Sequence, residues 1–70
     1  MRVGLVAPTQ TLLDEVADPK MKRNDIVATY ALALTTMEEV DWPVVNRAII
    51  DRWSLSALTY IKDRAWRLRR

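Results

Sequence analysis

Apolar residues recur three and four positions apart over residues 44–70, which is the spacing of amphipathic helices. This segment is predicted to form two helices that meet at a tight corner near Trp53. The chain holds a single Gly, and tight β-hairpins depend on that residue. We therefore expect an all-α fold, a small bundle of three to four helices formed by one domain over residues 1–70.

Two helices are expected in the first half of the chain. Apolar residues lie at helical spacing within residues 9–17, and Pro19 ends that segment. A second helix, over residues 25–38, follows Asn24 or Asp25, both of which are favourable N-caps. Apolar residues cover most sides of this second helix, so we expect it to be the central packing element.

Two more helices are expected in the second half. Asp41 is a favourable N-cap before a helix over residues 43–53, and Ser54 or Ser56 should cap a last helix over residues 55–69. Five apolar residues of the last helix should face the core: Leu55, Leu58, Ile61, Ala65 and Leu68. Six residues near its start should face away from the core: Ser54, Ser56, Ala57, Thr59, Tyr60 and Asp63.

Positive charge is concentrated at the carboxyl end of the sequence. From Arg52 onward there are six Lys or Arg and one acidic residue, so residues 52–70 carry a net charge of +5, whereas residues 1–51 carry −3. A concentrated cationic surface attracts polyanions more strongly than the same charge spread over the whole molecule. The asymmetry therefore favours a nucleic-acid partner.

The packing needs of a helix-turn-helix are met over residues 44–61. Ala48 is small enough for a second helix to cross the first, Trp53 supplies the apolar residue of the turn, and Leu58 faces inward. The run AIIDRWSLSALTYI resembles the DNA-binding module of the resolvase and invertase recombinases and, more broadly, helix-turn-helix domains of phage and mobile-element regulators. The resemblance covers residues 44–61 only.

The chain departs from that module at two positions. The turn glycine usual in the module is Arg52 here, and the Thr usual after the capping Ser is Ala57. An arginine in a left-handed turn costs roughly 1 kcal/mol, so we expect a corner of different geometry. Nothing similar to the recombinase catalytic domain is present, and no strand-cleaving activity is implied.

The resemblance and the charge pattern together imply a small sequence-specific DNA-binding protein, such as a transcription regulator or a recombination or replication accessory factor. Four residues are predicted to contact bases of double-stranded DNA: Ser56, Thr59, Tyr60 and Asp63. Six cations are predicted to contact the phosphates: Arg52, Lys62, Arg64, Arg67, Arg69 and Arg70. Ser54 is predicted to belong to the same DNA-binding surface, where its short side chain can approach base edges.

A helical module that binds a protein is the alternative that the same sequence leaves open. Its support is an apolar N-terminal arm, expected over residues 1–7 in place of a strand, together with the acidic segment 38–41. A second copy of the chain or another protein would be contacted through Val3, Leu5, Val6 and Trp66.

Catalysis, metal binding and membrane insertion have no support in the composition. Cys and His are absent, so the commonest zinc ligands and the usual base of a catalytic Ser are missing. No apolar run approaches the ~18 residues of a membrane span, and the first residues are not typical of a secretory signal. We expect no enzyme activity, no cofactor, no small-molecule substrate and a cytoplasmic location.

Overall fold

The computed structural model describes residues 7–36 and 39–69. Over these residues the chain forms four α-helices: α1 (Ala7–Ala17), α2 (Arg23–Thr35), α3 (Trp42–Arg52) and α4 (Leu55–Leu68). No strand occurs in this described part, and the predicted all-α fold is confirmed. Residues 1–6 of the predicted arm lie outside the described residues, whereas Ala7 already belongs to α1.

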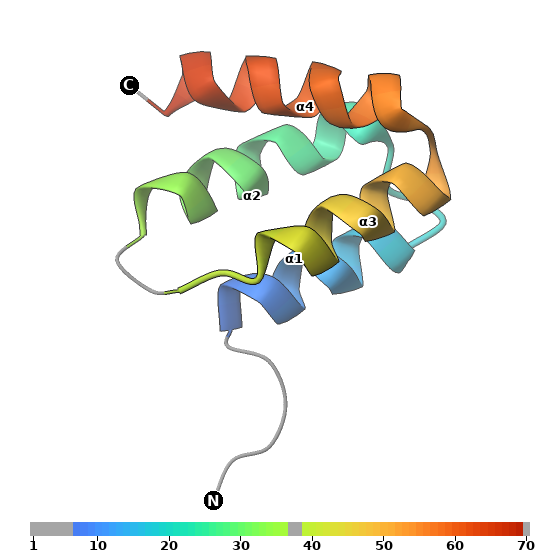
Figure 1. Ribbon diagram of the computed structural model, residues 1–70, viewed down its shortest axis with the longest axis horizontal. Coiled ribbons are helices and arrows are strands. Elements are labelled where there is room, and N and C mark those ends of the chain that lie inside the picture. Colours follow the sequence, from blue (N-terminus) through green and yellow to red (C-terminus); the bar gives the residue numbers. More distant parts are fainter. Residues whose placement is uncertain (1–6, 37–38, 70) are drawn as a thin grey trace, which may run out of the picture.

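The four helices form two layers (Figure 1). α1 and α3 run side by side in one layer, and α2 and α4 run side by side in the other, with the two helices of each layer pointing the same way. The most extensive pair is α2 with α4, although the whole of α3 separates them in the sequence. This parallel packing places the start of α2 beside the first half of α4.

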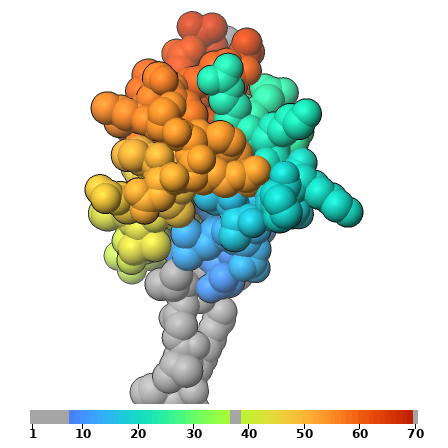
Figure 2. Space-filling model, turned by 90° about the vertical axis from the view of Figure 1, so that its right-hand side faces the viewer, coloured from blue at the N-terminus to red at the C-terminus, as the bar shows by residue number. Residues whose placement is uncertain are grey.

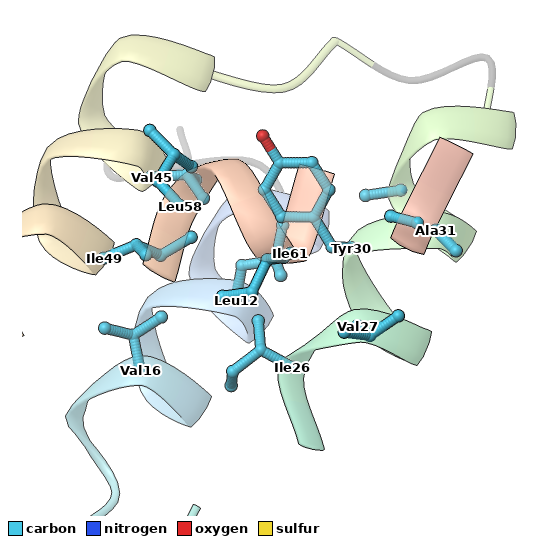
Figure 3. Close-up of a cluster of buried hydrophobic side chains, with 12 residues drawn as sticks. Leu12, Val16, Ile26, Val27, Tyr30, Ala31, Val45, Ile49, Leu58 and Ile61 are labelled. Atoms are coloured by element: carbon cyan, nitrogen blue, oxygen red, sulfur yellow. The ribbon is translucent and has the colours of Figure 1, made fainter. Parts of the chain in front are cut away.

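Side chains from all four helices meet in one core (Figure 3). Leu12 of α1, Ile26 of α2, Ile49 of α3 and Ile61 of α4 have no exposed surface. Complete burial of a side chain of this size contributes roughly 1.5–3 kcal/mol, so these residues are a main source of stability. The inner side of α4 is therefore held by apolar packing.

Tyr30 of α2 lies in the middle of this core (Figure 3). Its ring packs against Trp42 with the ring centroids 4.8 Å apart, and its hydroxyl donates to Oδ1 of Asn46 at 2.7 Å. Burial disfavours the tyrosinate and raises the pKa of Tyr30 to about 12. The neutral phenol thus connects α2 with α3.

The bounds of α2 differ from the prediction at both ends. The helix begins at Arg23, two residues before the predicted start, because Asp25 in its first turn accepts a hydrogen bond from the backbone N–H of Lys22 at 2.8 Å. It ends at Thr35, before the predicted end at residue 38, because Thr36 has an extended backbone with φ −75° and ψ 151°. Asp25 therefore acts from inside the helix and does not occupy the N-cap position.

The corner between α3 and α4 consists of Trp53 and Ser54. Trp53 has φ −119° and ψ −82°, and Ser54 has φ −177° and ψ 170°, so neither residue is left-handed. Arg52 is the last residue of α3, so it does not occupy a left-handed turn position. Ala48 and Trp53 are partly buried against the core and Leu58 is buried, as predicted.

The predicted orientation of α4 is confirmed for three of its five apolar residues and is wrong for two. Leu55 and Leu68 are 65% and 60% exposed. Each three-residue step moves about 60° around a helix, so these leucines lie at opposite edges of the apolar stripe, beyond the surface that the core covers. The outward prediction for Ala57 is also wrong: it is buried, because it lies one turn before Tyr60 on the side of α4 that α2 covers.

Replacing Leu58 with Ala should lower the free energy of unfolding by about 2–4 kcal/mol, because the deletion removes a buried side chain and leaves a cavity. The matched change Leu55→Ala, in the same helix, should cost less than about 1 kcal/mol because that side chain is largely exposed. Urea unfolding followed by circular dichroism measures both losses. Equal losses would show that the buried side of α4 is assigned wrongly.

The raised pKa of Tyr30 predicts a loss of stability at alkaline pH. The ordinary value of 10.0 applies to the unfolded chain and about 12 to the folded chain, so the folded state keeps the phenol proton to higher pH. The contribution of Tyr30 is fully present below about pH 10 and is lost as the pH rises towards 12. Urea unfolding at a series of pH values should show this fall, and Tyr30→Phe should reduce it. The same fall in both proteins would contradict the assignment to Tyr30.

Candidate nucleic-acid interface

The side of α4 that faces away from the core carries a stripe of exposed residues. They follow one another in three- and four-residue steps, and at about 100° per residue they share one side of the helix. We call this stripe the outer face of α4; it comprises Ser56, Thr59, Asp63, Trp66 and Arg67. The stripe therefore offers hydroxyl groups near the helix start, and larger aromatic and charged groups towards its end.

The hydroxyl groups at the start of α4 contact their own helix. Thr59 Oγ1 donates to the carbonyl oxygen of Leu55 at 3.2 Å, and Ser56 Oγ lies 3.2 Å from Ser54 Oγ. Ser54 Oγ also accepts the backbone N–H of Ala57 at 3.1 Å, which makes Ser54 the N-cap of α4. A hydroxyl oxygen has two acceptor positions, so Ser56 and Thr59 can still accept from a ligand.

Cations lie along both edges of the outer face. At about 100° per residue, Lys62 and Arg69 fall on one edge and Arg64 falls on the other, next to α2. All three are exposed, and none forms an ion pair with the described residues. Within the stripe, charge is balanced because Arg67 pairs with Asp63 at 3.3 Å. The stripe is therefore neutral at its centre and positive at its margins.

A further group joins α4 to the start of α2. We call it the Tyr60 cluster; it comprises Arg23, Asn24, Tyr60 and Arg64. The Tyr60 hydroxyl donates to Oδ1 of Asn24 at 3.0 Å. The guanidinium carbons of Arg23 and Arg64 lie 4.5 and 4.9 Å from the centroid of the Tyr60 ring, within the range of cation–π interactions. Half-buried Tyr60 thus lies at the α2 margin of the outer face and not within it.

Arg23 and Asn24 were not predicted from the sequence as interface residues. Asn24 is 36 positions from Tyr60, and only the packing of α2 on α4 brings them together. Figure 2 shows this side of the molecule, where the start of α2 (teal) lies beside α4 (orange). The one sequence signal is the basic run before α2, in which Lys20 and Lys22 are both exposed.

Arg52 has a different environment from the other predicted phosphate contacts. Its Nη1 donates to the carbonyl oxygens of Val16 and Asp18, each at 2.7 Å, and its Nη2 donates to that of Pro19 at 3.4 Å. The guanidinium carbon also lies 4.4 Å from the centroid of a Trp53 ring. These contacts hold Arg52 against the end of α1, away from the outer face of α4.

Trp66 is half exposed, and the guanidinium carbon of Arg69 lies 4.1 Å from the centroid of its ring. Both side chains are therefore at the surface towards the end of α4. Four residues predicted as contacts lie outside the described part of the chain: Val3, Leu5, Val6 and Arg70.

The described residues offer neither a candidate metal site nor a membrane-spanning helix. Within residues 7–36 and 39–69, acidic side chains nowhere gather in a group of three that could hold a metal ion. Among the same residues, no helix has the length and apolar character needed to cross a membrane. Comparison with protein-family models, with curated proteins and with solved structures finds no match to this chain.

Arg52→Met should lower the free energy of unfolding by about 1–3 kcal/mol, because the charged hydrogen bonds to the end of α1 are lost while the aliphatic stem is retained. Arg47→Met is the matched control: it lies in the same helix and pairs only with Asp51, at 3.1 Å on the exposed surface. That pair is worth about 0.3–0.5 kcal/mol. Urea unfolding compares the two variants, and equal losses would show that the carbonyl contacts of Arg52 do not stabilise the fold.

Proposed function

We propose that this protein binds double-stranded DNA, with α4 as a recognition helix in the major groove, in the manner of a helix-turn-helix protein. The observation that carries the proposal is the outer face of α4, a solvent-exposed stripe with cations along both margins. The resemblance of residues 44–61 to the DNA-binding module of recombinases supports the same conclusion. The role would be that of a small regulator, or of a recombination or replication accessory factor of phage or plasmid type, acting in the cytoplasm.

The arrangement of α4 suits the dimensions of duplex DNA. The major groove is about 12 Å wide and admits an α-helix, which then directs its outer side towards base edges and its margins towards the phosphates of the two strands. On α4, Lys62 and Arg69 would contact one strand and Arg64 the other. The two margins can thus be positively charged without placing excess charge against the bases.

Within the groove, the outer face would supply the groups that distinguish bases. Ser56 and Thr59 can exchange hydrogen bonds with base edges, and Asp63 can accept from the amino group of cytosine. Arg67 would then leave Asp63 and bind a phosphate, since the surface pair between them is worth little energy. This exchange would allow the acidic Asp63 to lie against DNA, which is itself negatively charged.

A protein partner is the second candidate, favoured by a shallow apolar groove between α2 and α4. Leu32 and Leu68 are 70% and 60% exposed and line this groove with Ala28 and Ala31. Exposed apolar residues gathered in one patch are typical of surfaces that another protein covers. A second copy of the chain or a different protein would bury them.

Arg67→Gln should weaken binding to duplexes of any sequence about 3–10-fold and reduce the salt slope by about 1, because one phosphate contact is lost. Arg47→Gln is the matched control, since Arg47 forms the same kind of one-turn ion pair, with Asp51 on α3, and is equally exposed. It should leave affinity unchanged. Fluorescence anisotropy of labelled duplexes at several salt concentrations measures both quantities.

Thr59→Ala provides the complementary measurement, because it should change the preference among duplex sequences and leave the salt slope unaltered. Equal weakening by Arg67→Gln and Arg47→Gln would mean that net charge alone matters and that α4 is not the recognition helix. Millimolar, salt-insensitive binding would contradict the DNA proposal and favour the protein partner.

A further inference from the structure

Two positive charges share one aromatic ring in the Tyr60 cluster. The guanidinium carbons of Arg23 and Arg64 lie 4.5 and 4.9 Å from the ring centroid of Tyr60, so their separation cannot exceed the sum of these distances. Both guanidinium groups are exposed, and two like charges held against one ring repel each other. A group that binds both arginines at once would relieve this repulsion.

The acidic residues next to these arginines are engaged elsewhere. Asp25 accepts the backbone N–H of Lys22 at 2.8 Å, and Asp63 pairs with Arg67 at 3.3 Å. No described carboxylate forms an ion pair with Arg23 or Arg64. The start of α2 adds a partial positive charge through the helix dipole. The cluster is therefore a concentration of donors without an internal anion.

We propose that the Tyr60 cluster binds a single phosphate group, with Arg23 and Arg64 donating to its oxygens. Guanidinium groups match phosphate oxygens in geometry and form hydrogen bonds strengthened by charge. The inference rests on the proposed function for the source of the ligand, which is a backbone phosphate of the duplex beside the groove that α4 occupies. It adds a contact from α2 to an interface otherwise made by α4.

Tyr60 acts in this site as a positioning residue. Its ring is in contact with both guanidinium groups, and its hydroxyl is held by Asn24 at 3.0 Å. Arginine side chains have many rotamers, and restricting them before binding lowers the entropy lost on binding. The ring thus restricts the rotamers of the two arginines before the ligand binds.

Inorganic phosphate is the probe for the first experiment. Titrated into isotope-labelled protein at constant ionic strength, with chloride as the reference anion, it should shift the NMR signals of Arg23, Tyr60 and Arg64 saturably. Arg64→Gln should raise the dissociation constant about tenfold, whereas Arg47→Gln, with the same change of charge, should leave it unchanged. Unsaturable shifts, or equal effects of the two variants, would overturn the site.

The positioning role is tested by two variants of Tyr60. Tyr60→Phe keeps the ring and should bind phosphate within about twofold of the unaltered chain. Tyr60→Leu removes the ring and should weaken phosphate binding nearly as much as the loss of one arginine, while circular dichroism confirms that the helices remain. Equal phosphate affinity of the two variants would overturn the role of the ring.

Duplex DNA is the probe for the second experiment, and it separates this inference from the proposed function. Arg23→Gln should weaken duplex binding about tenfold and reduce the salt slope by about 1. If Arg67→Gln weakens binding and Arg23→Gln does not, the phosphate site is overturned while the DNA proposal stands. If phosphate saturates the cluster and no duplex binds, the DNA proposal fails and the site holds a phosphate from another source.

Discussion

The parallel packing of α2 against α4 is the contact on which the rest of the structure depends. Both helices contribute small buried side chains, including Ala31 of α2 with Ala57 and Ala65 of α4. Small residues at a helix contact allow the axes to approach closely. This packing holds one side of α4, leaves its opposite side in solvent, and brings the start of α2 to Tyr60. The core and the candidate interface are therefore two sides of the same helix.

Polar side chains connect the segments that apolar packing alone would align loosely. Buried Thr9 accepts the backbone N–H of Asp41 at 3.0 Å, which joins α1 to the start of α3. Thr29 donates to Glu15 at 2.9 Å and joins α2 to α1. A core of this size yields only about 3–5 kcal/mol of net stability, so such directed contacts carry much of the specificity of the arrangement. The first of these bonds joins the two helices of one layer, and the second joins the two layers.

Local signals in the sequence predicted the four helices, because apolar spacing, Pro19 and the Ser54 cap act within a few residues of where they lie. The orientation of α4 was predicted only in part, since the spacing marks the centre of an apolar stripe and not its edges, where Leu55 and Leu68 lie. The Tyr60 cluster was not predicted because it depends on which distant helix covers α4. The bonding of Arg52 was missed for a related reason: in a sequence, an arginine held by carbonyl groups looks the same as one free to bind phosphate.

The corner at Trp53 and Ser54 has a consequence for how the sequence can vary. Because neither residue has a positive φ, no position there requires glycine. The shape of the bend is maintained by side chains instead, through the guanidinium of Arg52 and the hydroxyl of Ser54. Related sequences could therefore change the geometry of this junction through side-chain substitutions. A glycine at position 52 would instead remove the hydrogen bonds of Arg52 to the end of α1 and increase the conformational freedom of the unfolded chain.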